Sequence, residues 1–341
     1  MIQNYKLKGP WRITFDTNPD LCNLHCIMCE ERSKYKMKNI SQNRLMDFKI
    51  IKKVIKTAIK YGLKEVIPST MGEPLLYQHF EELIELIERF NLKLNLTTNG
   101  TFPKLGVDKW GKLIIPVASD IKISINGTSK ETAESIMEGI NFNRQIENIK
   151  KLIIIRDQFR KAKINDPKIT FQATFMESNL KELPEILNLA IELDIDRFKG
   201  HHLWITHPEL SDESLRRDDE SIRRWNQIVK KLYNLAERKS LKNGQKIKLE
   251  NIYELNNLEN KEIVPNNWIC PFLGREAWIA WDGTFNVCCA PNELRKTLGI
   301  FGSVQENDFI DLWNKSEYNS LISNWGKYEV CSKCNMRKPL K

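Results

Sequence analysis

Eight cysteines are the side chains of this 341-residue chain best suited to binding a metal, and they gather in two groups. Three lie within residues 22–29, with the spacing C-x3-C-x2-C. The other five lie within residues 270–334, and none lies between the groups. A disulfide framework would normally extend through a small secreted chain. Two tight groups at opposite ends of a longer chain instead predict two metal sites.

The first group, Cys22, Cys26 and Cys29, places three thiolates on one short segment. Three thiolates can hold three irons of a cubane cluster, and thiolates favour iron–sulfur clusters because both partners are soft. A structural zinc site usually takes four ligands in paired spacings. His25 lies between two of the cysteines, and we expect it to point away from them. The missing fourth ligand leaves one iron open to a substrate or cofactor.

This segment follows a strand-like run at 11–17 and resembles the cluster loop of the radical S-adenosylmethionine (SAM) enzymes. The family also has a G-G-E-P-like segment after its second strand. Gly72, Glu73 and Pro74 match it here, with Met71 in place of the first glycine. The resemblance implies that they contact the amino group of bound SAM, which a carboxylate and backbone carbonyls suit. A simple turn before a helix is the alternative reading.

Two further strand ends resemble the family pattern. Asn99 lies in a T-N-G segment, and Ser124 and Asn126 lie in an S-x-N-G segment where the family usually has S-x-D-G. The resemblance implies that Ser124 reaches the ribose or methionine part of SAM and that both asparagines line the same site. Two glycine turns would explain the motifs without cofactor contact. Asn126 also argues against an acidic function at its position.

Strand and helix patterns alternate through the first two thirds of the chain. Apolar residues recur at helical spacing between strand-like runs, as in Phe48, Ile51 and Ile55. Strands that alternate with helices imply right-handed βαβ units and a parallel sheet. The fold class is therefore α/β, and the resemblance implies a partial (β/α)6 parallel barrel. The six strand-like runs are residues 11–17, 64–68, 92–97, 120–125, 168–176 and 196–204.

Active sites of parallel barrels lie at the carboxyl ends of the strands. The cysteine loop, Glu73, Asn99 and Ser124 all follow expected strands, so they should converge. In the fifth strand Gln172 shares a face with Thr170 and Thr174, and we expect it to contact the cofactor or substrate. A polar barrel core is the alternative.

The sixth strand ends in His201 and His202, one of which we expect on the substrate side as a binding or proton-transfer group. The pair has too few companions for a metal site. His207 follows in a loop, where we expect no function.

In the second group, Cys270, Cys288, Cys331 and Cys334 come from separate segments and can enclose one metal centre. A turn at 282–283 predicts a hairpin that brings the first two together. Four thiolates satisfy either a zinc ion or a [4Fe–4S] cluster, and spacing alone does not choose between them.

The tail resembles the SPASM and shorter twitch domains of radical SAM enzymes, because Gly283 and Cys288 have the family's G-x4-C spacing and a C-x2-C pair follows. The later cysteines of a full SPASM domain are absent, so the resemblance implies a twitch-like domain with one auxiliary [4Fe–4S] cluster. Cys289 is then left over. We expect it to act in catalysis as a hydrogen-atom donor; the alternatives are another ligand or a small buried hydrophobic residue.

Composition narrows the class of protein further. The chain has 53 Lys and Arg against 44 Asp and Glu, a net charge of +9, and its mean hydropathy is −0.46. No apolar run approaches the roughly 18 residues of a membrane span, and the first residues lack a signal-peptide core. We expect a cytoplasmic protein without membrane contact.

The Arg pairs at 216–217 and 223–224 are interleaved with acids, which favours a solvated helix face over nucleic-acid binding.

Three domains are expected: a radical SAM core at 10–210, a barrel-closing helix and connector at 211–265, and a twitch-like auxiliary cluster domain at 266–341. The resemblance implies an enzyme that cleaves SAM reductively and abstracts a substrate hydrogen atom, modifying a peptide or protein residue. The alternatives are oxidation of a small alcohol or sugar, or a non-catalytic iron–sulfur or zinc protein. The enzyme would need an external electron donor such as flavodoxin or ferredoxin.

Overall fold

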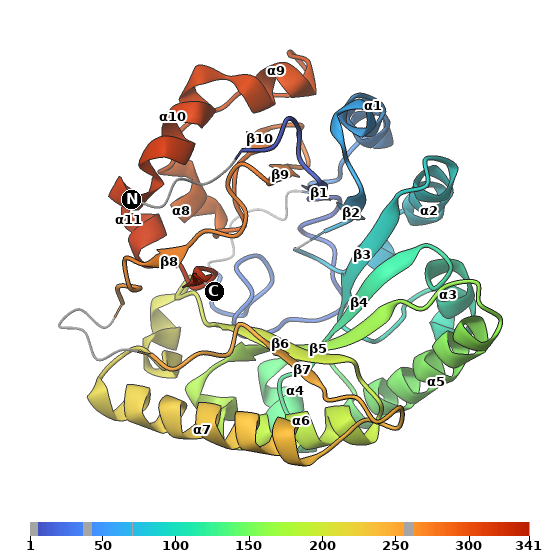
Figure 1. Ribbon diagram of the computed structural model, residues 1–341, viewed down its shortest axis with the longest axis vertical. Helices are drawn as coiled ribbons and strands as arrows, with labels where there is room; N and C mark the ends of the chain where they lie inside the picture. Colours follow the sequence, from blue (N-terminus) through green and yellow to red (C-terminus); the bar gives the residue numbers. More distant parts are fainter. Residues whose placement is uncertain (1–5, 37–42, 70, 256–261, 341) are drawn as a thin grey trace. The chain divides into compact units, whose positions relative to one another are not determined.

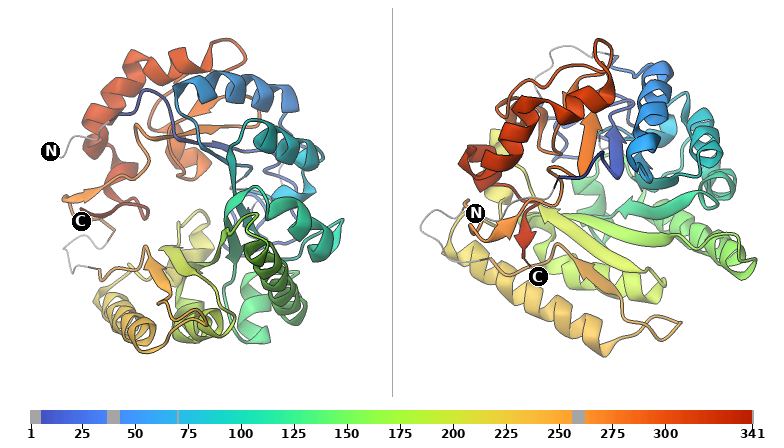
Figure 2. Two further views of the ribbon diagram at one scale, coloured as in Figure 1. Left: turned by 45° about the vertical axis from the view of Figure 1, so that its right-hand side comes forward. Right: turned by 45° about the horizontal axis from the view of Figure 1, so that its top comes forward.

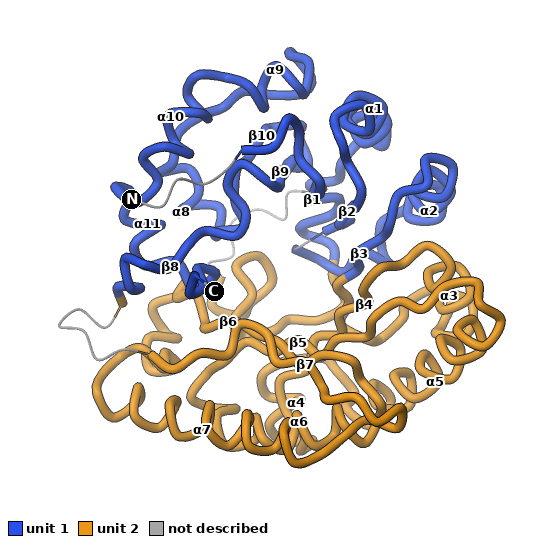
Figure 3. Tube along the Cα trace, in the orientation of Figure 1, with its two compact units in different colours: residues 1–21, 40–96, 263–341 blue, residues 22–39, 97–262 orange. Residues whose placement is uncertain are grey.

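The computed structural model describes residues 6–36, 43–69, 71–255 and 262–340 (Figure 1). The chain divides into two compact units (Figure 3). The first unit holds residues 1–21, 40–96 and 263–341, and the second holds residues 22–39 and 97–262. The cysteine loop and the later strands therefore belong to the second unit, and the cysteine-rich tail belongs to the first.

The second unit is built on a parallel sheet with the strand order β4 (Ala118–Ser124), β5 (Lys168–Phe175), β6 (Arg197–His202) and β7 (Lys248–Glu250). Helices cover one face of this sheet (Figure 2). On that face Phe175 of β5 packs on Trp225, with 4.8 Å between ring centroids. The helices are α3 (Gly106–Ile114), α4 (Lys130–Ile136), α5 (Phe142–Lys161), α6 (Leu183–Glu192) and α7 (Asp219–Arg238).

Successive side chains of a strand point to opposite sides of the sheet. On the face away from the helices, these side chains are polar. One row crosses all four strands: Ser124 pairs in register with Gln172, which pairs with Lys199, which pairs with Glu250. All four side chains of this row are half-buried. The row includes Ser124, the last residue of β4, and the carboxyl ends of strands are where parallel α/β folds place their chemistry.

The strands of the first unit are mostly parallel and follow the order β10 (Phe285–Asn286), β9 (Glu276–Ile279), β1 (Arg12–Phe15), β2 (Glu65–Ile67) and β3 (Lys93–Thr98). Only β10 runs antiparallel, against β9. The last two residues of β3 are counted with the second unit. The helices are α1 (Phe48–Ala58), α2 (Phe80–Arg89), α8 (Asn292–Lys296), α9 (Phe309–Asn314), α10 (Ser316–Asn324) and α11 (Glu329–Ser332).

Helix α1 illustrates how local sequence sets these elements. Asp47 caps its first turn by accepting a hydrogen bond from the amide of Lys49 at 2.8 Å. Ile51, Val54 and Ile55 are fully buried, and the segment ends at Gly62, whose φ of +99° is the left-handed conformation typical after a helix.

The α/β class and the six strands expected from the sequence are confirmed. The hairpin expected at 282–283 is also present, as β9 and β10. Residues 309–324 form two helices, because Lys315 has extended backbone (ψ 143°) that ends α9 and begins α10. None of the described helices is long and apolar enough to cross a lipid bilayer.

Candidate active site

The cysteine loop of the second unit is positioned by the residues between its cysteines. The amide of His25 donates to the carbonyl of Glu138 at 2.8 Å, and that of Ile27 donates to the carbonyl of Ile136 at 2.9 Å. Leu24 and Ile27 enter a buried apolar cluster. Alternation of apolar and cysteine residues therefore anchors the loop beside the end of α4. The cluster's other buried members are Ile136, Met137, Ile140, Met176, Leu203 and Leu210.

The three thiols of this loop are close enough to influence one another. Burial raises the pKa of Cys26, and the neighbouring Cys29 and Cys22 raise it further. Backbone amides already point at sulfur: Leu24 N lies 3.4 Å from Cys22 Sγ, and Arg32 N lies 3.3 Å from Cys29 Sγ. Such donors stabilise the thiolate form that an iron–sulfur cluster requires.

Within the described ranges, no three His, Cys, Asp or Glu side chains are arranged to hold a single metal ion. None of the eight cysteines is paired in a disulfide. A cubane cluster binds each thiolate to a different iron, so its ligands surround a larger volume than one ion occupies.

Two basic side chains hold the carbonyls of this loop. Arg32 Nη2 lies 3.4 Å from the carbonyl oxygen of Cys22, and His207 Nε2 lies 3.0 Å from that of Cys29. The expectation that His207 has no function therefore overlooked a buried contact with the cluster loop. His25 contacts Arg32 and not a thiol, which agrees with its expected orientation.

The carboxyl ends of β3 and β4 are tied together by Gln145 of α5, a residue that the sequence analysis missed. Its Nε2 lies 2.8 Å from the carbonyl oxygen of Asn99 and 2.9 Å from that of Ser124. The Asn99 side chain reaches Asn23 Oδ1 at 3.0 Å and lies 3.9 Å from Cys22 Sγ. The structure thus brings Asn99 and Ser124 together beside the cysteine loop.

The remaining expected residues of this unit lie along the polar face of the sheet. Asn126 Oδ1 accepts from the amide of Thr174 at 2.9 Å, so this side chain joins β4 to β5. Gln172 neighbours Ser124 in register. His201 neighbours Thr174, and burial together with Lys199 lowers the pKa of His201 to about 4.

His202 faces the other way, because its ring packs on Trp225 with centroids 4.6 Å apart. Of the two histidines, His201 is therefore the one on the side of the candidate site. At neutral pH it is an uncharged donor and acceptor.

The loop after β4 is held by the carboxylate of Glu182. Its oxygens accept from the amides of Thr128 and Ser129 at 2.6 and 3.1 Å, and from the hydroxyls of Ser129 and Thr132 at 2.7 and 2.6 Å. Burial acts to raise the pKa of Glu182, but the hydrogen bonds from Thr132, Thr128 and Ser129 outweigh it and lower the pKa to about 2. This carboxylate therefore fixes the segment that follows Ser124 and Asn126.

Replacing Glu182 with glutamine should lower the free energy of unfolding at pH 7 by about 1–2 kcal/mol, the usual range for hydrogen bonds to a partly exposed charge. Because the folded pKa lies below the ordinary value of 4.5, this stabilisation is complete above pH 4.5 and is lost as the pH falls toward 2. Urea unfolding from pH 7 to pH 3 measures the difference between the two proteins. The exposed Glu131→Gln is the control, and an equal effect of both substitutions would contradict the role of Glu182.

In the first unit, Gly72, Glu73 and Pro74 form a tight turn against the segment after β1. The carbonyl oxygen of Glu73 accepts from Asn18 Nδ2 at 2.8 Å, and its amide donates to the carbonyl of Leu21 at 2.9 Å. Glu73 Oε1 lies 3.3 Å from the amide of Leu75 and caps a short 3-10 turn. Asn18, which the sequence analysis missed, therefore holds the segment expected to meet the amino group of SAM.

The tail of the first unit brings its cysteines together. Burial and, to a smaller extent, a neighbouring thiol raise the pKa of Cys270 to about 12 and that of Cys288 to about 11. The amide of Met336 lies 3.4 Å from Cys334 Sγ. Burial also raises the pKa of Cys289, which interacts with the same thiols. A buried set of thiols with amide donors fits an iron–sulfur cluster.

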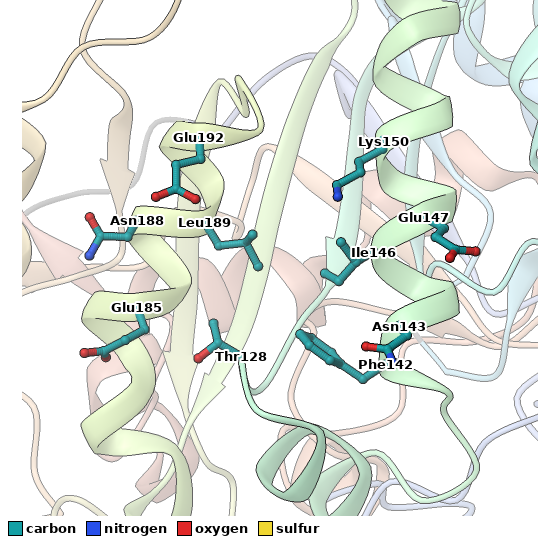
Figure 4. Close-up of a pocket in the computed structure, with 10 residues that line it drawn as sticks. All are labelled: Thr128, Phe142, Asn143, Ile146, Glu147, Lys150, Glu185, Asn188, Leu189 and Glu192. Carbon is teal, nitrogen blue, oxygen red and sulfur yellow. The ribbon is translucent and has the colours of Figure 1, made fainter.

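A groove of about 530 Å³ lies elsewhere on the second unit, between α5 and α6 (Figure 4). Phe142, Ile146 and Leu189 give it an apolar floor, and Glu147, Lys150, Glu185 and Glu192 lie around it. None of the expected site residues lines this groove.

The fold and the cysteine loop define an enzyme that uses an iron–sulfur cluster together with SAM. The chain belongs to the Radical SAM superfamily, which matches residues 19–190. Residues 270–335 match the SPASM iron–sulfur cluster-binding domain. The protein is thus a radical SAM enzyme with a [4Fe–4S] cluster, SAM as cofactor and an auxiliary iron–sulfur domain.

Individual proteins resemble it over most of its length. The tungsten-containing aldehyde ferredoxin oxidoreductase cofactor-modifying protein of Pyrococcus furiosus is 26% identical, over 93% of this chain and 85% of that protein. Streptococcus suis SuiB bound to its precursor peptide SuiA has a TM-score of 0.65 at 16% identity, over 97% of this chain and 72% of that one. Native anSMEcpe with bound AdoMet has a TM-score of 0.64 at 16% identity, over 96% of this chain and 89% of that one.

Proposed function

We propose that this enzyme cleaves SAM reductively at a cluster held by Cys22, Cys26 and Cys29, and abstracts a hydrogen atom from a residue of a peptide or protein. The observation that carries the proposal is the convergence in the second unit. Asn99 lies 3.9 Å from Cys22 Sγ, and Gln145 joins it to Ser124. Three thiols without a fourth ligand on their loop stand beside polar groups at strand ends.

The residues of the chain have distinct tasks in this proposal. When bound, the cluster and SAM would supply reductive cleavage of a C–S bond and abstraction of a hydrogen atom from the substrate. Glu73 and the carbonyls of its turn receive the amino group of SAM, and Ser124, Asn126 and Gln172 line its nucleoside or methionine part. An external one-electron carrier such as flavodoxin or ferredoxin supplies the electron.

The tail cysteines Cys270, Cys288, Cys331 and Cys334 hold the auxiliary cluster. Cys289, which interacts with Cys288, Cys334 and Cys270, is the thiol beyond these four and would return a hydrogen atom to a substrate radical. A Cys289→Ala variant that keeps all of its iron decides whether Cys289 donates a hydrogen atom or only fills space.

An anaerobic assay with dithionite as reductant tests the central proposal. The reconstituted enzyme should convert SAM to methionine and 5′-deoxyadenosine, which mass spectrometry quantifies. A peptide substrate carrying deuterium at the reacting position should transfer deuterium into 5′-deoxyadenosine. Production of methylthioadenosine or S-adenosylhomocysteine without 5′-deoxyadenosine would refute reductive cleavage.

A second candidate is modification of a small cofactor precursor. The Pyrococcus furiosus relative is a cofactor-modifying protein that aligns with nearly the whole chain. The polar row of Ser124, Gln172, Lys199 and Glu250 suits a compact polar molecule as well as a peptide backbone. The same assay separates the two candidate functions. Extracts of small metabolites and synthetic peptides are offered in turn, and only a sample that contains the substrate should accelerate 5′-deoxyadenosine formation.

A further inference from the structure

A buried arginine lies within the tail and takes no part in the function proposed above. The side chain of Arg337 is 5% exposed. Its guanidinium donates to three carbonyl groups: Trp268 from Nε at 3.0 Å, Pro265 from Nη2 at 2.8 Å and Cys331 from Nη1 at 3.3 Å. It also lies 4.7 Å from the centre of the Trp325 ring. These contacts fix the guanidinium in one orientation.

Arg337 has no carboxylate partner within ion-pair distance in the part of the chain that the structure describes. Charged side chains are rarely buried unless they are paired, because desolvation of an unpaired ion is costly. The second buried arginine of the tail, Arg295, differs, since Asp16 lies 3.7 Å from it. The positive charge of Arg337 therefore requires another anion.

Three cysteines also lie near the guanidinium of Arg337, which bonds to the carbonyl of one of them, Cys331. The guanidinium interacts electrostatically with Cys334, Cys331 and Cys270, three of the four thiols assigned to the auxiliary cluster. A [4Fe–4S] cluster with four thiolates carries a net charge of about −2 when oxidised and gains another negative charge on reduction. A loaded cluster thus supplies the missing anion.

We propose that Arg337 is the counter-ion of the auxiliary cluster and makes it easier to reduce. The inference rests on the proposed assignment of the tail cysteines to that cluster. A fixed positive charge in a buried site stabilises the more negative, reduced form, and net charge and hydrogen bonding are among the factors that set cluster potentials. The bond to the Cys331 carbonyl additionally orients the C-x2-C segment.

The test compares Arg337→Lys, which keeps the charge, with Arg337→Gln, which removes it. Both are made in a Cys22/Cys26/Cys29→Ala background, so that only the auxiliary cluster remains. A redox titration followed by electron paramagnetic resonance gives its midpoint potential. Arg337→Gln should lower the reduced-to-oxidised ratio at a fixed potential at least tenfold, or 59 mV for a one-electron couple. Arg337→Lys should change it less, and the exposed Arg275→Gln should leave it unchanged.

Each further outcome decides between explanations. An unchanged potential in an Arg337→Gln protein that keeps its iron would overturn the counter-ion role. Loss of iron from Arg337→Gln but not from Arg337→Lys would support the counter-ion role, because lysine keeps the positive charge that glutamine lacks. Loss from both would assign Arg337 a purely structural role and overturn the inference. Zinc, or no iron, in the background protein itself would instead refute the auxiliary cluster assignment.

Discussion

Replacing Cys26 with alanine should lower the rate of 5′-deoxyadenosine formation from SAM by at least about 1,000-fold, because two thiols cannot retain the cluster on which cleavage depends. Cys26 is the middle ligand of its loop and interacts with both other thiols. The same variant should lose about four irons per chain and keep those of the tail. Anaerobic reconstitution followed by iron and sulfide analysis measures both numbers.

The control for this prediction lies on the same loop. Lys34 is exposed, pairs with Glu138 at the surface and lies over the Tyr35 ring, so Lys34→Gln should keep both the iron and the cleavage rate. A Cys26→Ala protein that cleaved SAM at the wild-type rate would remove the three-cysteine loop from the mechanism.

Replacing Gly72 with alanine should weaken SAM binding by at least about tenfold and destabilise the turn by about 1–3 kcal/mol, the range for strained backbone. Gly72 has a φ of +72°, and an added Cβ would lie 2.2 Å from the carbonyl oxygen of Asn18 and 2.8 Å from that of Leu21. Both oxygens belong to backbone, so the turn must move away from them. That movement displaces Glu73, which Asn18 holds in place. Equilibrium dialysis of SAM and thermal unfolding measure the two effects.

Gly62→Ala separates strain from collision. Gly62 also has a positive φ, of +99°, but nothing lies within 4 Å of an added Cβ. It should therefore show a stability loss from strain without the loss of SAM affinity. Equal SAM affinity in Gly72→Ala and wild type would show that this turn does not contact the cofactor.

Elements with strong local periodicity could be predicted from the sequence. In β5, Thr170, Gln172 and Thr174 alternate with Phe171 and Phe175, and the structure places the two sets on opposite faces. The six expected strands are all present, so the residues at their carboxyl ends were predicted together with them. The same alternation separates His201 from His202, although the sequence analysis did not apply it to them.

Contacts between distant segments could not be predicted. Gln145 and His207 look like ordinary polar residues of a helix and a loop, and each gains its role only from a partner far away in the chain. His207 and Cys29, for example, are 178 residues apart. Asn18 is a similar case, since its partner is the backbone of Glu73. No local pattern records which carbonyl such a side chain reaches.

The pairing of β9 with β1 could not be predicted from the sequence either, and it affects the order in which the chain can fold during synthesis. Arg12 and Glu276 are register partners, although 264 residues separate them. During synthesis β1 can pair with β2 early, but its other edge stays open until the tail has left the ribosome, and open edges invite wrong partners. Completion of the first unit therefore waits for almost the whole chain. Deleting the tail would remove a strand from this sheet along with the cysteines, so single substitutions report on the auxiliary centre more cleanly than truncations.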